Sequence, residues 1–93
     1  MAWKVEFDPR ALAELSKLDR VAQTRIVKFL QGRLVGRTDP RELGKALTGE
    51  MAGFWRYRIG DYRAVCFLDD KRQVAEVMRV AHRKEVYRRN ARM

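Results

Sequence analysis

Three arginines on one predicted β-hairpin are the residues of this chain best suited to chemistry. Arg56 and Arg58 alternate along one strand, and Arg63 begins the next. Because successive residues of a strand alternate between faces and directly opposed residues share one, all three side chains should project from the same face. Like charges opposed across a strand pair destabilise it, so the cluster favours an anionic ligand over charges that serve only solubility.

Guanidinium groups in this arrangement could support the cleavage of RNA. Attack of a ribose 2′-hydroxyl on the adjacent phosphodiester builds negative charge on the non-bridging oxygens, which preplaced cations stabilise. Arginine is a poor general base because its pKa lies above about 12, so phosphate binding follows more directly than proton transfer. The acidic residues are scattered, the one histidine, one serine and one cysteine fall in no nucleophile motif, and no glycine loop cradles phosphates. We therefore expect no metal ion and no cofactor.

The charge of the whole chain supports an anionic partner. The net charge is +9 over 93 residues, and residues 56–93 carry eleven Lys and Arg against five Asp and Glu. Such a surface attracts nucleic acid, an anionic membrane or an acidic protein, and the excess of arginine over lysine in the second half favours nucleic acid. The length predicts one domain, 1–93. With no signal peptide and no apolar run of about 18 residues, a soluble cytoplasmic protein is expected.

A two-residue turn, Gly60-Asp61, defines the hairpin that carries the arginines. Glycine at the first central position suits a type II′ turn, which needs φ > 0 there. Such a turn fixes the register, so Ile59 should pair with Tyr62, and the pairing should continue to Phe54 opposite Phe67. The face opposite the arginines then carries an apolar set: Trp55, Tyr57, Ile59, Ala64 and Cys66.

The elements around this hairpin predict a small α+β domain. They are a strand over 2–7, a helix from Asp8-Pro9 to about Leu18, a second helix from Asp19 to about Val35, a loop at 36–40, a weak helical turn at 41–52, the hairpin, a third meander strand over 73–81 and a short basic helix over 82–90. The order β-α-α-β-β-β-α predicts a small antiparallel sheet with an edge strand from the N-terminus. The helical hairpin should pack on the apolar face and leave the arginine face open. Arg79 falls on the helix side unless a one-residue bulge moves it to the arginine side.

The basic terminal helix adds further candidates. Arg83 and Tyr87 lie four residues apart, on one face of that helix, and the tyrosine could stack on a base or orient the reacting group. His82 is interpreted as a helix-capping or packing histidine that could also touch RNA. Lys84 and Arg88 fit either a solvated basic helix or a contact with RNA.

Two segments together resemble the RelE/ParE superfamily of toxin–antitoxin toxins. They are 55–63, WRYRIGDYR, and 80–88, VAHRKEVYR, supported by the Phe7-Asp8 strand end and by Leu47-Thr48-Gly49. The resemblance covers nearly the full length and implies a small antiparallel sheet flanked by helices. In the RelE-like branch it implies cleavage of mRNA in the ribosomal A site without metal. The catalytic residues it implies are matched here by Arg56, Arg58, Arg63, Arg83 and Tyr87. The RNA-binding candidates, His82, Lys84 and Arg88, come from the basic terminal helix itself.

The resemblance also implies partners. These are an acidic RelB-like antitoxin, the ribosome with its mRNA, and operator DNA reached only through the toxin–antitoxin complex. Some RelE toxins carry lysines where this chain has Arg56 and Arg58, which leaves the general base unassigned. The expectation is a ribosome-dependent mRNA endonuclease toxin. The alternatives are a ParE-like inhibitor of DNA gyrase without nuclease activity and an inactive relic that acts only in a repressor complex.

Overall fold

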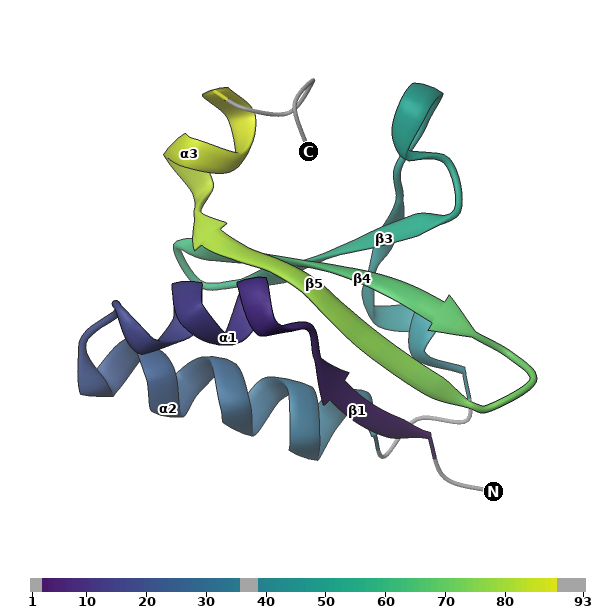
Figure 1. Cartoon of the computed structure of the whole chain (residues 1–93), viewed down its shortest axis with the longest axis horizontal. Coiled ribbons are helices and arrows are strands. Elements are labelled where there is room, and N and C mark those ends of the chain that lie inside the picture. Colours follow the sequence, from purple (N-terminus) through teal and green to yellow (C-terminus); the bar gives the residue numbers. More distant parts are fainter. Residues whose placement is uncertain (1–2, 36–38, 89–93) are drawn as a thin grey trace.

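A computed structural model describes residues 3–35 and 39–88, of which residues 86–88 by their backbone alone. Its centre is a five-stranded sheet in the order β1-β5-β4-β3-β2. Helices α1 and α2 lie on one side of the sheet and α3 on the other (Figure 1). The strands are β1 (Lys4–Phe7), β2 (Lys45–Ala46), β3 (Phe54–Ile59), β4 (Tyr62–Asp69) and β5 (Val74–His82). The helices are α1 (Pro9–Ser16), α2 (Arg20–Lys28) and α3 (Arg83–Arg88), with shorter helical segments η1 (Phe29–Leu34), η2 (Pro40–Leu43) and η3 (Gly49–Met51).

Two capped helices form the hairpin that covers one face of the sheet. The Asp8 carboxylate accepts a hydrogen bond from the backbone N–H of Arg10 at 3.0 Å, and Asp19 accepts one from that of Ala22 at 2.8 Å. These caps begin α1 and α2 where the sequence predicts, and α2 continues as the π-helical segment η1. The helical stripe and the apolar sheet face form one core, as predicted, which includes Leu15, Ile26, Leu30, Leu34, Tyr57, Ile59, Ala64 and Cys66.

Strands β3 and β4 pair in the predicted register. Phe54 opposes Phe67 at one end of the antiparallel pair, and Ile59 opposes Tyr62 at the other. Gly60 has φ +60° while Asp61 stays at negative φ, which agrees with a type II′ turn. The two-residue turn therefore decides which side chains share a face, and it places Arg56, Arg58 and Arg63 together.

The last strand in the sequence, β5, lies inside the sheet. It pairs antiparallel with β4 and parallel with β1. The N-terminal strand is thus an edge strand, as predicted, and its parallel pairing makes the sheet mixed rather than wholly antiparallel. A register shift between Val65 and Cys66 passes over Met78 and sets Arg79 opposite Val65. The bulged alternative is the one that occurs, so Arg79 belongs to the arginine side of the sheet.

The segment before β3 differs from its sequence prediction. In place of a weak helical turn over 41–52, it holds η2, the two-residue strand β2 and η3. Residues 36–38 of the predicted loop and residues 89–90 of the predicted terminal helix lie outside the described residues. Over the described ranges, no helix is long and apolar enough to cross a membrane.

Candidate functional site

Four cationic side chains line one pocket on the arginine side of the sheet. Arg56 and Arg58 come from β3, Arg63 from β4 and Lys45 from β2. The pocket measures about 180 Å³, and Leu43 and Gly44 complete its lining, so none of its lining residues is acidic. We call it the arginine pocket. Cations gathered from three strands create a positive local potential, which favours a phosphate or another oxyanion.

Lys45 reaches the arginine pocket because β2 lies beside β3. Lys45 opposes Arg56 in the β2–β3 pair. The preceding Gly44 permits this approach, since a Cβ atom there would stand 2.7 Å from Cε1 of Tyr57 and 3.1 Å from the carbonyl oxygen of Arg56. The buried Tyr57 hydroxyl donates to the carbonyl of Pro40 at 2.9 Å, and burial raises the pKa of this phenol.

A second contact fixes the segment that leads into β2. The guanidinium of Arg41 donates to Asp70 at 2.8 Å and to Asp39 at 3.2 Å. The hydrogen bond to Asp70 is the main cause that raises the pKa of Arg41. The same guanidinium lies 5.8 Å from the centre of the Trp55 ring, within cation–π range. This anchor holds η2, and with it β2, at the edge of the sheet.

Arg63 is a buried member of the pocket and not a freely projecting one. Its side chain is 5% exposed, and its Nη1 donates to the carbonyl oxygens of Gly60 at 2.9 Å and Tyr62 at 2.8 Å. These bonds hold the guanidinium against the hairpin turn, while Arg58, directly opposite on β3, is exposed. A buried cation held in place beside an exposed one suits a site in which charge is preorganised before the ligand arrives.

Arg79 lies on the arginine side of the sheet, but its guanidinium group is bound to Glu14. Its Nε and Nη2 donate to Oε2 of Glu14 at 2.9 and 2.7 Å, and the other carboxylate oxygen accepts from the backbone N–H of Val80 at 2.8 Å. The Glu14 carboxylate thereby takes the place of a neighbouring strand beyond the end of the β1–β5 pairing. Arg79 is a structural arginine of the sheet edge and does not line the arginine pocket.

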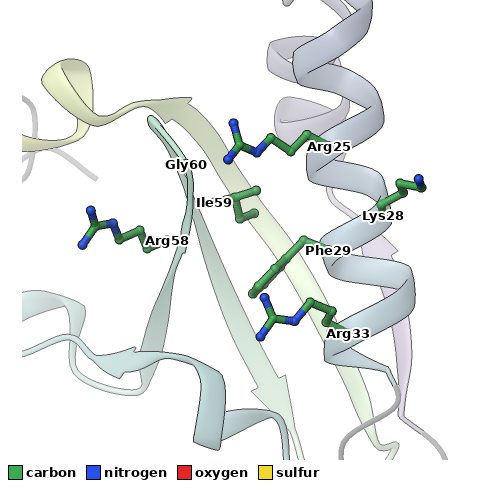
Figure 2. A pocket seen from close by; sticks show the side chains of 7 residues that line it. All are labelled: Arg25, Lys28, Phe29, Arg33, Arg58, Ile59 and Gly60. Atoms are coloured by element: carbon green, nitrogen blue, oxygen red, sulfur yellow. The ribbon is translucent and has the colours of Figure 1, made fainter.

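A second basic pocket lies between α2 and the end of β3 (Figure 2). It measures about 310 Å³ and is lined by Arg25, Lys28, Phe29, Arg33, Arg58, Ile59 and Gly60. Figure 2 shows Arg25 and Arg33 reaching toward β3, with the Phe29 ring between them, while Arg58 points to the other side of its strand. Arg33 lies 5.4 Å from the centre of the Phe29 ring. Because Arg58 lines both pockets, cationic side chains stand on both sides of the end of β3.

The C-terminal candidates are attached to the hairpin turn. The backbone N–H of Arg83 donates to the carbonyl of Asp61 at 2.8 Å, so α3 starts beside the turn between β3 and β4. The ring of His82 packs edge-on against Tyr62 at 5.5 Å, and its Nδ1 accepts from the N–H of Lys84 at 3.2 Å. His82 therefore caps the start of α3 and packs against Tyr62, which agrees with its interpretation from the sequence as a capping or packing histidine. Arg83 and Lys84 are exposed, and the side chains of Tyr87 and Arg88 lie outside the described residues.

Other reactive groups of the described chain lie away from these pockets. Cys66 is fully buried in the core, and burial raises the pKa of its thiol to about 12. Within residues 3–35 and 39–88, no group of three or more His, Cys, Asp or Glu side chains could hold a metal ion.

Lys45 is the site residue that the sequence prediction missed. Its segment shows neither alternation nor strand propensity, and only a tertiary contact brings it beside Arg56. The pair Gly44-Lys45 before the aromatic strand was the available signal, because a glycine in an extended segment often marks a close approach of two backbones.

The sequence matches a family that agrees with this fold and this charge. The family model described as "ParE toxin of type II toxin-antitoxin system, parDE" matches residues 5–87. The chain belongs to this family and is a toxin of the RelE/ParE superfamily, as the resemblance from the sequence implied.

Individual relatives agree with this assignment. Toxin RelG of Mycobacterium tuberculosis is 35% identical over 89 residues, which span 96% of this chain and all of that protein. The toxin–antitoxin complex RelBE2 of the same organism contains a chain of the same fold, with a TM-score of 0.82, 32% identity and coverage of 88% of this chain and 92% of that one. The isolated RelE toxin of E. coli has a TM-score of 0.69, 29% identity and coverage of 97% and 96%.

Proposed function

We propose that this toxin is an endoribonuclease that cleaves messenger RNA in the A site of the ribosome, without a metal ion. The arginine pocket carries the proposal, because Lys45, Arg56, Arg58 and Arg63 converge there from three strands. Four cations in the arginine pocket fit a phosphodiester, because the negative charge of the phosphodiester increases during the reaction.

The proposed reaction is an internal transfer on the RNA. The 2′-oxygen attacks the adjacent phosphorus, the bond from phosphorus to the 5′-oxygen breaks, and the products are a 2′,3′-cyclic phosphate and a 5′-hydroxyl. The proton of the 2′-hydroxyl passes to solvent, and the departing 5′-oxygen takes up a proton. Arg58 and the fixed Arg63 contact the non-bridging oxygens and stabilise the charge that builds on them.

Lys45 is the proposed source of the proton for the 5′-oxygen. Arginine keeps its proton under all ordinary conditions, whereas the amine of lysine can donate a proton and regain it. Lys45 faces Arg56 across the β2–β3 pair and lines the same pocket, so its amine can reach the atoms that the arginines hold. The arginines thus bind the phosphate, and the lysine transfers a proton.

The start of α3 would extend the site along the RNA. Arg83 and Lys84 are exposed and add positive charge beside the hairpin turn that joins β3 and β4. By the family resemblance, Arg83 and Tyr87 take part in catalysis, Tyr87 by stacking on a base or by orienting the reacting group. His82 and Arg88 stay candidates for contact with RNA, because they precede and end this basic helix, and His82 could make that contact in addition to capping α3.

The proposed partners follow from charge and from the relatives. RelBE2 is described as a toxin–antitoxin complex, and this chain, with its net charge of +9, would likewise bind an acidic RelB-like antitoxin. An acidic chain lying over the arginine pocket would keep it from RNA. Operator DNA would be bound by the complex and not by the toxin alone.

Cleavage of mRNA on purified, programmed ribosomes tests the proposal. Arg58→Ala should lower kcat by about 10²–10³-fold, the usual loss when one preorganised donor to a developing charge is removed. Lys45→Met should lower it as well. Lys45→Arg distinguishes the charge of Lys45 from proton transfer, because arginine keeps the positive charge but does not give up its proton. Cleavage by this variant should stay slow if the lysine amine donates a proton.

Arg72→Ala is the matched control. Arg72 is also a surface arginine, but it lies in the β4–β5 turn and pairs with Glu6 at 3.4 Å, away from the arginine pocket. The control should cleave at the wild-type rate. Wild-type cleavage by both Arg58→Ala and Lys45→Met would contradict the proposed site.

A second function, inhibition of DNA gyrase, is favoured by one observation. The matching family model is that of ParE toxins, and the ParE-like branch acts on gyrase without a nuclease site. Inhibition of supercoiling by the purified toxin and by its Arg58→Ala variant alike, with intact mRNA on the ribosome, would decide for this alternative.

A further inference from the structure

The arginine side of the sheet also carries an aromatic row. Side chains on this side form three rows across β3, β4 and β5: Phe54, Phe67 and Glu76, then Arg56, Val65 and Arg79, then Arg58, Arg63 and Ala81. Successive rows are about 6.6–6.8 Å apart, because side chains of one face recur every second residue. The two phenylalanines therefore lie one row beyond Arg56 and two rows beyond Arg58.

The phenylalanines of this row form a pair that is open to solvent. Their ring centroids are 5.7 Å apart at an angle of 59°. Phe67 is 41% exposed, and it is the aromatic one among the three large apolar side chains that are exposed in the described ranges. An exposed aromatic pair that stands in line with a cluster of cations suited to phosphate fits a ligand that carries both a phosphate and an aromatic group.

A pocket of about 360 Å³ adjoins the pair, and we call it the phenylalanine pocket. Its apolar walls are Phe54 and Met51 on one side and Val65 and Met78 on the other. Met78 is the residue that the β-bulge passes over, so the bulge itself shapes this pocket. Its polar lining comes from Asp8, Arg10, Glu50 and Arg79, of which Glu50 offers an acceptor and Arg10 offers donors to the edge of a bound ring.

We propose that the phenylalanine pocket binds one nucleobase of the RNA strand whose phosphate lies in the arginine pocket. This inference rests on the proposed endoribonuclease function and adds a base-binding subsite to it. Phe54 supplies the stacking face, and Phe67 supports the Phe54 ring from the neighbouring strand.

The order of the rows favours a nucleotide over a protein side chain as the occupant. A nucleotide joins an anionic phosphate to a flat ring through one ribose, and the sheet presents cations and then rings along the same strands. Stacking on an aromatic side chain is tolerant of sequence, while the carboxylate of Glu50 and the guanidinium of Arg10 can read hydrogen-bonding groups at the edge of the base.

The inference is tested directly by removing one base from the RNA, in addition to changing residues of the protein. Ribosomes are programmed with mRNA that carries a base-free ribose at each A-site position in turn, and cleavage is measured at subsaturating toxin. At one position the wild-type kcat/KM should fall about 5- to 150-fold, which corresponds to the 1–3 kcal/mol of one base–aromatic stack.

The kcat/KM of the Phe54→Leu variant on ordinary mRNA should be lower than that of the wild type by a similar factor. Removal of the base should then lower the kcat/KM of this variant no further. The Phe67→Leu variant, altered at an exposed position, should show the same behaviour to a smaller extent without a change in melting temperature. Phe54→Tyr keeps the ring and should restore the response to the base. Leu12→Ala is the control, because Leu12 is an exposed apolar side chain of α1 that lines none of the three pockets described above.

Several outcomes would overturn the inference. Wild-type cleavage that is unaffected by base removal at every position would do so, as would full sensitivity to base removal in Phe54→Leu. If both leucine variants weakened antitoxin binding and left the response to the base unchanged, the aromatic row would be a protein interface. These results leave the nuclease in place, whereas a wild-type toxin that cleaves no mRNA on the ribosome would remove the proposed function together with the subsite.

Discussion

The Glu14 carboxylate at the edge of β5 allows a quantitative prediction of stability. It accepts hydrogen bonds from two nitrogens of Arg79 and from the backbone N–H of Val80, at 2.7–2.9 Å. The side chains are 10% exposed for Arg79 and 22% for Glu14. Removal of one partner from a buried pair costs about 3–5 kcal/mol, and the partial exposure of Glu14 sets the expectation for Glu14→Ala at about 3 kcal/mol.

Two further variants show how much of this loss in unfolding free energy comes from the charge and from the burial of Glu14. Glu14→Gln keeps an acceptor for the N–H of Val80 and loses the charge, so it should cost about 1–2 kcal/mol. Glu6→Ala is the matched control, since Glu6 also pairs with an arginine, Arg72, but at 3.4 Å and with both side chains more than half exposed. Such a surface pair contributes about 0–1 kcal/mol.

Thermal and urea unfolding of the isolated toxin measure these differences. For a domain of this size, about 3 kcal/mol corresponds to a fall in Tm of roughly 12–24 °C. A loss below about 1 kcal/mol in Glu14→Ala, or equal losses in Glu14→Ala and Glu6→Ala, would refute the reasoning that the carboxylate replaces a strand at this edge.

Four other variants or conditions probe the elements behind the site. Gly44→Ala would bring a methyl group within 2.7 Å of the Tyr57 ring, so it should cost about 1–3 kcal/mol in unfolding free energy and lower mRNA cleavage by displacing Lys45. Tyr57→Phe leaves the Pro40 carbonyl without its donor and should cost about 1–2 kcal/mol in urea unfolding. The pKa of about 12 keeps the Cys66 thiol protonated, so a thiol reagent at pH 8 should label the protein only after unfolding. Because this folded-state pKa lies above the unfolded value of about 8.5, stability should fall by about 1.4 kcal/mol per pH unit above pH 8.5, and Cys66→Ala should remove that part of the slope.

The sequence predicts local features well where one residue decides them. Gly60 alone sets the turn and with it all of the β3–β4 register, and Asp8 and Asp19 fix the starts of α1 and α2. The arginines of the hairpin were found in this way, because a two-residue turn leaves no freedom in which face they share.

Features that depend on distant contacts could not be predicted in the same way. The bulge at Met78 shows no mark in a strand segment that is rich in apolar residues on both faces, so the side of the sheet on which Arg79 lies was open. Lys45 enters the arginine pocket only because Gly44 lets its segment approach β3. The burial of Arg63 arises from carbonyl groups of its own turn, which the residue types alone do not indicate.

The position of β5 inside the sheet has a consequence for the time at which this toxin becomes active. β5 is the last strand in the sequence and lies between β1 and β4, so it completes the pairing of both. While a ribosome synthesises the chain, β4 lacks this neighbour and Glu14 has no Arg79 to bind. Pairing over such a sequence distance forms late and slowly. The sheet that supports the arginine pocket is therefore completed only after β5 has emerged, so the proposed nuclease would become competent only after its own synthesis.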